Sequence, residues 1–269
     1  MIKRTKETKA ALARRLGISR ASLYYVSKQL PKDWALRERI EQVMTDHQDF
    51  GYPMISDELH VNRKRVYRVM RLFGMKAHRR RGKKPRKYGI SRTSYPNLLK
   101  GDFPKGPNDV WVADFTYLPY HGRFLYLATV LDLFTREIVG LSVMANHGVS
   151  LVLQALFSAV QGRTVPRIFH SDNGKEYGSR IFTRALEDLS IRISRSAKAS
   201  PWENGYQESF YSHFKLLLGD PERFKTLGEL VYEIYHCIWQ YNHTRNHSAL
   251  KMPPSIFAER YQKLMEKVS

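Results

Sequence analysis

The sequence predicts an α/β fold, in which a mixed five-stranded sheet with flanking helices is preceded by small all-helical domains. Two observations support this prediction. From residue 109 onward, strand-like apolar runs come first and then alternate with segments of helical spacing, whereas residues 1–75 show helical spacing only. Residues 76–108 between them are basic and contain Pro and Gly, which is typical of a linker.

The C-terminal part, residues 109–269, is expected to open with three neighbouring strands. These cover residues 110–117, 124–131 and 137–143, with a turn at 120–123. Helices and strands then alternate at 148–161, 167–170, 179–189 and 192–194, followed by a helix containing Glu208 and a long helix at 227–241. Three strands followed by helix, strand, helix, strand and helix is the order of a ribonuclease-H-like domain.

The first thirty residues are expected to form a helix-turn-helix. A helix at 6–16 would end at Gly17, and Ser19 would cap a second helix that runs towards Ser27. That second helix would present Ser19, Arg20 and Ser22 outward, which suits contact with a DNA major groove.

Residues 31–75 are expected to form a second helical, helix-turn-helix-like DNA-binding domain, with helices at 33–47, 55–60 and 62–73. The last of these has one apolar face and one basic face. The basic face carries Arg63, Lys64, Arg65, Arg68 and Arg71. A solvated surface is the alternative interpretation. DNA contact is favoured because no acidic residue stands within this basic run to relieve its mutual repulsion.

The positive charge is concentrated at one end of the chain, whose net charge is +20. Residues 1–108 carry 27 Lys and Arg against 9 Asp and Glu, whereas residues 109–269 carry 18 against 16. Such an asymmetry favours a polyanionic partner, DNA first, with RNA or ribosome association and simple solubility as alternatives. In the linker we expect phosphate contacts from Arg79, Arg80, Arg81, Lys83 and Lys84.

Other classes of protein are excluded by what the sequence lacks. The single cysteine, Cys237, rules out a disulfide framework and a multi-cysteine zinc site. His243 and His247 have zinc spacing, but no cysteine lies near them. No apolar run approaches the roughly 20 residues that span a bilayer, and residues 1–9 do not form a secretory signal. A cytoplasmic protein without a membrane partner fits best.

Three carboxylates stand out by position. Asp114 lies near the end of an apolar strand, Asp172 directly follows another strand, and Glu208 lies on a helix, separated from Asp172 by 35 residues. A charge in a buried strand is costly unless it is paired or bound to a metal. Phosphoryl transfer can use two divalent ions roughly 3.5–4 Å apart, and Mg²⁺ prefers oxygen ligands. Taken singly, each acid is also compatible with an ordinary cap or turn.

Two further residues are weighed against this trio. Asp132 follows the second strand and is a rival ligand, although a turn carboxylate paired with Arg136 is the favoured interpretation. His170 precedes Asp172 by two residues, where it either shapes the site or packs at the end of its strand.

The motifs together resemble the integrase-core DDE transposases, specifically the second-frame proteins of the bacterial insertion-sequence-three group. The similarity covers about residues 30–265. The matching stretches are residues 114–117, 170–177, 204–211 with Lys215, and 241–250 followed by Pro253 and Pro254. Residues 52–73 are shorter than the usual second helix-turn-helix of that group, and we find no sustained heptad of the kind found in first-frame proteins.

The resemblance implies an Mg²⁺-dependent enzyme, with Mn²⁺ as a substitute, whose ligands are Asp114, Asp172 and Glu208. It would nick double-stranded DNA at the terminal inverted repeats of an element and transfer the released 3′-hydroxyl to target DNA. It also implies a homo-oligomer on paired ends, a first-frame protein as a further partner, and a location at the bacterial nucleoid.

Several residues around Glu208 are additional candidates for DNA contact. Trp202 and Tyr206 have rings on which bases can stack, with core packing as the alternative for Trp202. Asn204 and Lys215 fall near the helical stripe of Glu208, and Lys215 suits a phosphate.

Two other functions remain open at this point. One is a DNA-binding regulator that descends from a transposase and does not cut DNA, although a complete carboxylate trio argues against it. The other is a ribonuclease-H-type enzyme that cuts RNA in hybrids, which usually has a fourth carboxylate and lacks basic N-terminal helices.

Overall fold

The computed structural model describes residues 8–24, 29–78, 95–101, 103–196 and 204–268. Its first two helices are α1 (Lys9–Arg15) and the 3₁₀ helix η1 (Arg20–Tyr24). Gly17 turns the chain between them with a φ of 65°. The Ser19 hydroxyl accepts a hydrogen bond from the backbone N–H of Ser22 at 3.1 Å, and so caps the second helix as expected. The part of this second helix that the structure describes, Arg20–Tyr24, is a 3₁₀ helix, and the rest of the predicted helix towards Ser27 lies outside the described residues.

The second helical unit consists of α2 (Gln29–Asp46), α3 (Tyr52–Leu59) and α4 (Arg63–Leu72). These helices enclose a small core of Leu36, Ile40, Val43, Phe50, Ile55, Val66, Val69 and Met70. The side chain of Asn62 accepts a hydrogen bond from the N–H of Lys64 at 2.9 Å and begins α4 where the sequence predicted. Helix α2 begins four residues before the expected start.

The sheet has five strands in the order β3-β2-β1-β4-β5. They are β1 (Val110–Tyr120), β2 (Arg123–Asp132), β3 (Ile138–Met144), β4 (Ile168–Ser171) and β5 (Arg192–Arg195). The first three are antiparallel, whereas β4 pairs in parallel with both β1 and β5. His121 and Gly122, both at positive φ, make the two-residue turn between β1 and β2. The predicted mixed five-stranded, ribonuclease-H-like sheet is confirmed.

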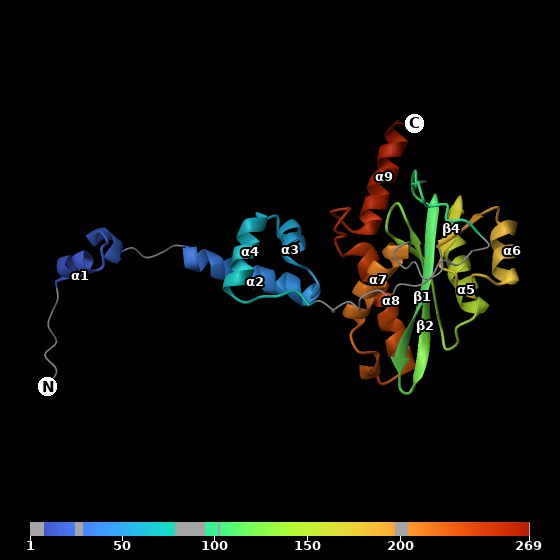
Figure 1. Cartoon of the computed structure of the whole chain (residues 1–269), viewed down its shortest axis with the longest axis horizontal. Helices are drawn as coiled ribbons and strands as arrows, with labels where there is room; N and C mark the ends of the chain where they lie inside the picture. Colours follow the sequence, from blue (N-terminus) through green and yellow to red (C-terminus); the bar gives the residue numbers. More distant parts are fainter. Residues whose placement is uncertain (1–7, 25–28, 79–94, 102, 197–203, 269) are drawn as a thin grey trace.

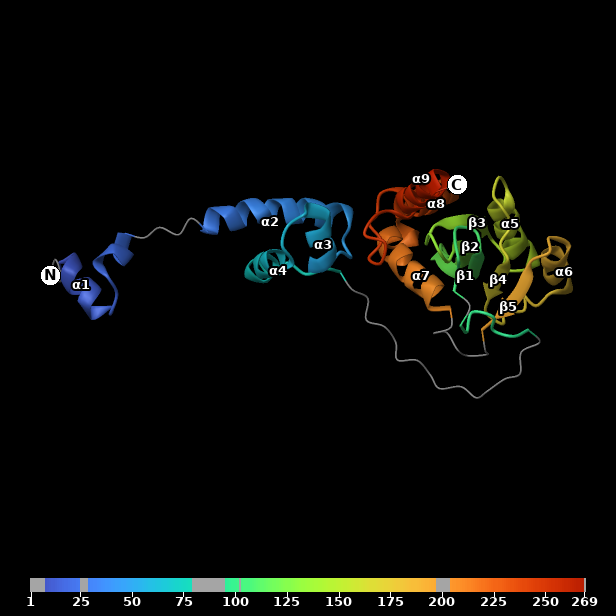
Figure 2. The same ribbon diagram turned by 90° about the horizontal axis from the view of Figure 1, so that it is seen from above.

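Helices cover both faces of the sheet (Figure 1, Figure 2). On one face lie α5 (Val149–Val160) and α6 (Arg180–Asp188), and on the other lie α7 (Gly205–Leu218) and α8 (Leu227–His243). Helix α5 packs so closely on β3 that a Cβ on Gly140 would come within 2.4 Å of the carbonyl oxygen of Ala155. The short η3 (Pro221–Arg223) and the terminal α9 (Pro254–Val268) were not predicted as separate elements.

Part of the expected linker packs on the sheet domain. Leu98 and Leu99 contact its core, and the N–H of Leu98 donates to the Ser194 hydroxyl at 2.9 Å. The N–H of Arg195 in turn donates to the carbonyl of Pro96 at 3.2 Å. The polypeptide therefore joins the sheet domain well before residue 109. In the portion of the chain that the structure describes, no helix has the length and apolar character needed to cross a membrane.

The helical unit α2–α4 contacts the sheet domain through its acidic residues. The Asp49 carboxylate pairs with Arg245 and lies 2.7 Å from Nδ1 of His213. Asp57 pairs with Lys251 at 2.9 Å, and Glu58 accepts a hydrogen bond from Asn246. Burial raises the pKa of Asp49, but the hydrogen bond from His213 and the charge of Arg245 outweigh this effect and lower the pKa to about 2.

Replacing Asp49 should loosen the contact between the two units. We expect Asp49→Asn to increase the radius of gyration in small-angle X-ray scattering and to speed proteolysis between them. The reason is that it leaves a largely buried Arg245 without its carboxylate, at a cost of roughly 1–3 kcal/mol. Asp46→Asn, at an exposed acid on α2, is the matched control. Identical scattering from both variants would show that Asp49 does not hold the units together.

Candidate active site

Asp114 and Asp172 are brought together by the parallel pairing of β1 with β4. Ala113 and Ser171 are partners in that register, so the next residue on each strand is an aspartate at the same edge. One carboxylate oxygen of Asp172 accepts the N–H of Gly174 at 2.9 Å. A Cβ at Gly174 would lie 2.9 Å from that same oxygen, so a larger residue there would displace the Asp172 carboxylate.

The electrostatics show that the charge of Asp172 acts on Asp114. Burial, and then the negative charge of Asp172, raises the pKa of Asp114 to about 7; the charge of Glu208 raises it further and that of Lys215 lowers it. Burial is also the main cause of the raised pKa of Asp172. Like charges in a partly buried site disfavour ionisation unless a cation joins them.

Helix α7 is held on the sheet by side chains that bond to the backbone of β1. Nε2 of Gln207 donates to the carbonyl of Val112 at 2.7 Å, and the Tyr211 hydroxyl donates to that of Asp114 at 2.7 Å. Asn204 donates to the carbonyl of Ala113 at 3.3 Å. The buried Thr129 hydroxyl links Gln207 and Tyr211, at 3.0 and 2.9 Å.

This attachment sets where Glu208 lies. Glu208 follows Gln207 in the first turn of α7, and its charge acts on Asp114. Its side chain is exposed. Within the described ranges, no three His, Cys, Asp or Glu side chains are gathered closely enough to hold a metal ion. The structure thus sets two of the predicted carboxylates side by side and carries the third on the helix anchored beside them.

The neighbours of Glu208 take different positions. Nζ of Lys215 lies 5.3 Å from the centre of the Tyr117 ring, close enough to Asp114 for its charge to lower the pKa of that carboxyl. Tyr206 is 47% exposed. Asn204 is buried against β1, so the side chain expected at a DNA surface packs on the strand backbone instead. Trp202 lies outside the described residues.

Two groups near Asp172 were not assigned a role from the sequence. Glu176, whose charge raises the pKa of Asp172, lies 2.9 Å from Nδ1 of His147. Arg195 is buried, donates to the carbonyl of Tyr177 at 2.5 Å, and lowers the pKa of Asp172. Glu176 lies within the motif that follows Asp172, so its position in the sequence could have predicted that it lies near Asp172. Arg195 lies at the end of β5, and nothing in the sequence indicated that it would lie near Asp172.

Asp132 and His170 have structural roles. The Asp132 carboxylate is buried and accepts the backbone N–H groups of Asn108, Phe134 and Thr135, the last two at 2.7 and 3.0 Å. The predicted pairing with Arg136 is wrong, because these backbone donors satisfy the carboxylate. His170 is fully buried, and its Nδ1 lies 2.9 Å from the Ser194 hydroxyl.

Of the residues of the helical units that were expected to contact DNA, some are exposed and others form ion pairs within their own unit. Ser19, Arg20, Ser22, Lys64 and Arg65 are exposed. Two basic residues of α4 do have acidic partners, contrary to expectation.

Arg68 pairs with the buried Asp33 of α2 at 2.6 Å, and Arg63 pairs with Asp57 of α3 at 3.1 Å. Sequence distance concealed both pairs. Arg79, Arg80, Arg81, Lys83 and Lys84 lie outside the described residues.

Known proteins match this chain over the same regions. Residues 104–201 match the family described as integrase core domain, and residues 189–254 match a second family of the same description. The transposase for insertion sequence element IS904 of Lactococcus lactis is 34% identical over 87% of this chain and 97% of its own length. The chain belongs to the integrase-core transposases of bacterial insertion elements.

Two further matches agree with this family. Transposase InsF for insertion sequence IS3A of Escherichia coli is 34% identical, over 75% of this transposase and 73% of its own length. A chain of the simian T-cell lymphotropic virus intasome, solved with a PP2A regulatory subunit, is 17% identical. It covers 82% of this transposase and 74% of its own length, with a TM-score of 0.52. The viral likeness supports the ribonuclease-H-like fold alone.

Removing the charge of Asp114 should stabilise the metal-free transposase at high pH. Between about pH 4 and 7 folded Asp114 keeps a proton that the unfolded chain has lost, so this group makes folding less favourable as pH rises through that window. We expect Asp114→Asn to raise the Tm in EDTA more at pH 8 than at pH 5. The stabilisation, expressed as free energy of unfolding, should be larger at pH 8 by on the order of 1–3 kcal/mol.

Asp188→Asn is the control for this measurement, because Asp188 is exposed on α6. An equal change in Tm at the two pH values for Asp114→Asn would contradict the raised pKa of Asp114.

Proposed function

We propose that this transposase binds the ends of its element, cleaves the DNA there to release 3′-hydroxyls, and transfers them to target DNA. Asp114, Asp172 and Glu208 would hold Mg²⁺, or Mn²⁺ in its place. The main support is the pairing of Asp114 with Asp172 on adjacent parallel strands, together with the charge of Glu208 acting on Asp114.

The donor set suits a hard divalent cation. All three groups offer carboxylate oxygens, the ligands that Mg²⁺ prefers. Burial is the main cause of the raised pKa values of Asp114 and Asp172, and the charge of neighbouring carboxylates adds to it. A bound cation would favour the ionised form of both groups. When bound, Mg²⁺ would polarise the phosphodiester and favour ionisation of the attacking hydroxyl. Binding one ion to all three groups would require the exposed Glu208 side chain to approach the two aspartates.

Residues of this chain would position the DNA. Gln207, Tyr211 and Asn204 fix the direction of α7 against β1, which keeps Glu208 on the side of Asp114. Lys215 would bind a phosphate next to the carboxylates as a point charge. The basic residues of the linker would contact phosphates without reading the DNA sequence. The helical units would hold the duplex as well, with Ser19, Arg20 and Ser22 in the major groove.

The partners follow from the reaction. Joining an element end to a target requires two DNA segments at one active site, so we expect a homo-oligomer on paired ends. The similar viral chain comes from an intasome. A first-frame protein, expected from the resemblance, would contribute to recognition of the ends.

Glu208→Gln should abolish cutting while leaving DNA binding nearly intact. The change removes a ligand oxygen and its charge but few phosphate contacts, so the nicking rate should fall on the order of a hundredfold or more. The measurement is Mg²⁺-dependent nicking of a duplex carrying the inverted repeat beside the gene, with affinity measured in parallel.

Glu187→Gln, at an exposed acid on α6, is the control and should nick normally. If Glu208→Gln weakened binding as much as nicking, the role given to Glu208 would be refuted. If the unaltered chain bound the duplex tightly but did not nick it with any divalent ion, a non-cutting regulator would be the better interpretation.

Replacing Arg79, Arg80 and Arg81 with Ala should weaken DNA binding and flatten its salt dependence. For every phosphate that the variant no longer neutralises, the slope of log affinity against log salt should fall by about 0.9. The matched control replaces three exposed arginines of the sheet domain, Arg180, Arg184 and Arg260, for the same change in net charge. An unchanged slope for the linker variant would reject the phosphate-binding role of these arginines.

A second candidate activity, cleavage of RNA in hybrids, is favoured by one observation. Enzymes that cut RNA in hybrids usually have a fourth carboxylate. Glu176 is a fourth carboxylate here, because its charge raises the pKa of Asp172, although its side chain also contacts His147. Comparing Mg²⁺-dependent cleavage of an RNA–DNA hybrid with that of the same duplex in DNA distinguishes the two activities.

A further inference from the structure

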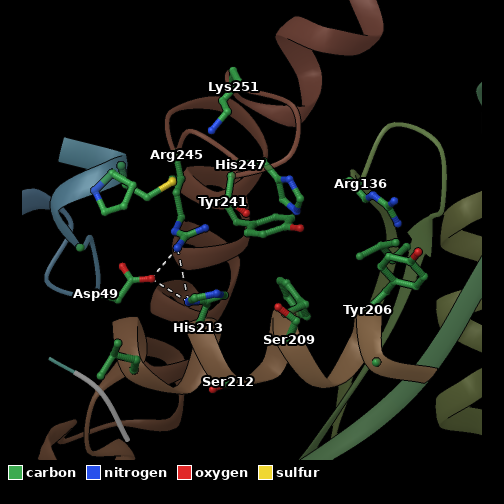
Figure 3. Close-up of a pocket in the computed structure, with 18 of the residues that line it drawn as sticks. Asp49, Arg136, Tyr206, Ser209, Ser212, His213, Tyr241, Arg245, His247 and Lys251 are labelled. Carbon is green, nitrogen blue, oxygen red and sulfur yellow. Dashed lines mark hydrogen bonds and ion pairs between the residues drawn. The ribbon is translucent and has the colours of Figure 1, made fainter. Parts of the chain in front are cut away.

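A pocket of about 900 Å³ lies between the helical unit and the sheet domain (Figure 3). Its walls come from the segment between α2 and α3, from α7, and from the loop after α8. At one end Asp49 is bonded to Arg245 and His213, which offsets the positive charge there. At the other end lie Arg136 and Tyr206.

The pocket adjoins the candidate active site through α7. Gly205, Ser209 and Ser212 line it. Gln207 and Tyr211 bond instead to β1. At roughly 100° of rotation per residue, Glu208 lies on the border between these two stripes of the helix. A strand whose phosphodiester lies at Glu208 therefore has the pocket within reach of its next nucleotide.

The Arg136 end has the chemistry of a nucleotide site. The guanidinium carbon of Arg136 lies 4.0 Å from the centre of the Tyr206 ring. Its Nη1 atom is buried and has no hydrogen-bond partner among the described residues. Arg136 stands in the tight turn after β2, at a φ of 64°, where its N–H donates to the carbonyl of Asp132 at 2.8 Å. The backbone thus directs a cationic donor into the pocket.

The charge balance of the walls also favours an anion. Asp49 is the one acid among the lining residues that the structure describes, and Arg245 and His213 already bond to it. Burial, and then the charge of Arg136, lowers the pKa of His247 to about 4, so His247 is neutral near pH 7. The positive charge that faces the cavity at that pH comes mainly from arginine and lysine.

We infer that this pocket takes one unpaired nucleotide of the DNA strand adjacent to the bond that is cut. Arg136 would bind its phosphate, and the base would lie against Tyr206. A volume of this size encloses a small ligand. A paired base cannot enter without leaving its partner and its stack. The inference rests on the proposed function, because it places the nucleotide relative to a cleaved phosphodiester.

The test compares three duplexes of equal length bound to the full chain in EDTA, by fluorescence anisotropy. One is blunt, one carries a short single-stranded thymine overhang, and one carries the same overhang without bases. Stacking of a base on an aromatic side chain contributes about 1–3 kcal/mol, so the thymine overhang should bind about tenfold or more tightly than the abasic overhang.

Variants locate this preference in the pocket. Tyr206→Ala should reduce the preference for the thymine overhang over the abasic one to near one, whereas Tyr206→Phe should keep it because the ring remains. Arg136→Ala should weaken the binding of both overhangs relative to the blunt duplex, because both carry the phosphate that Arg136 would bind. Tyr232→Ala and Arg123→Ala, at exposed positions outside the pocket, are the matched controls and should bind all three duplexes like the unaltered chain. Unchanged binding of the blunt duplex verifies that each variant is folded.

Equal affinity of the unaltered chain for thymine and abasic overhangs would overturn the inference, as would a full preference in Tyr206→Ala. Because these affinities are measured in EDTA, they are independent of nicking. Mg²⁺-dependent nicking without an overhang preference would refute the pocket alone. An overhang preference in a chain that never nicks would refute the proposed function and, with it, the placement beside a cleaved bond.

Discussion

The attachment of α7 to the central strand is the interaction on which the arrangement of the site depends. Three polar side chains of one helical stripe, Asn204, Gln207 and Tyr211, donate to backbone carbonyls of β1 inside an otherwise apolar interface. A buried amide without a partner is costly, so only a narrow range of helix positions satisfies all three. Apolar packing would hold α7 on the sheet but would tolerate sliding. The hydrogen bonds fix its register, and with it the position of Glu208.

The sheet accounts for the other half of the geometry. Parallel neighbours place residues of equal register at the same edge, so a carboxylate on β1 and one just after β4 become neighbours although 57 positions separate them in the sequence. Burial then raises both pKa values, and the charge of Asp172 adds to the shift of Asp114 while that of Glu176 adds to the shift of Asp172. The fold thus concentrates negative charge where the peptide chain itself offers little to offset it, apart from Lys215 and Arg195.

Local patterns in the sequence were sufficient for most of the fold. Apolar alternation located β1 to β3, Asn62 located the start of α4, and the order of elements indicated the ribonuclease-H-like sheet. Motif spacing selected Asp114, Asp172 and Glu208. What the sequence concealed depends on contacts between distant segments: the ion pairs of Arg63 and Arg68, the buried position of Asn204, and the contribution of Arg195 from β5. Asp132 is a turn carboxylate, as the sequence favoured, but its partners are backbone groups rather than Arg136, and side-chain patterns do not report backbone partners.

The acidic contact of the helical unit has a thermodynamic consequence. Asp49 bonds to Arg245, and both residues line the same cavity as Arg136 and Tyr206. A ligand in the cavity that draws Arg245 away from Asp49 must weaken the hold on α2–α4. If that ligand changes the affinity of the N-terminal helices for a second ligand by some factor, the second ligand changes the affinity of the cavity by the same factor. Such linkage is reciprocal by necessity. Capture of a duplex by the N-terminal helices and engagement of a strand near Glu208 would therefore be cooperative or antagonistic, but not independent.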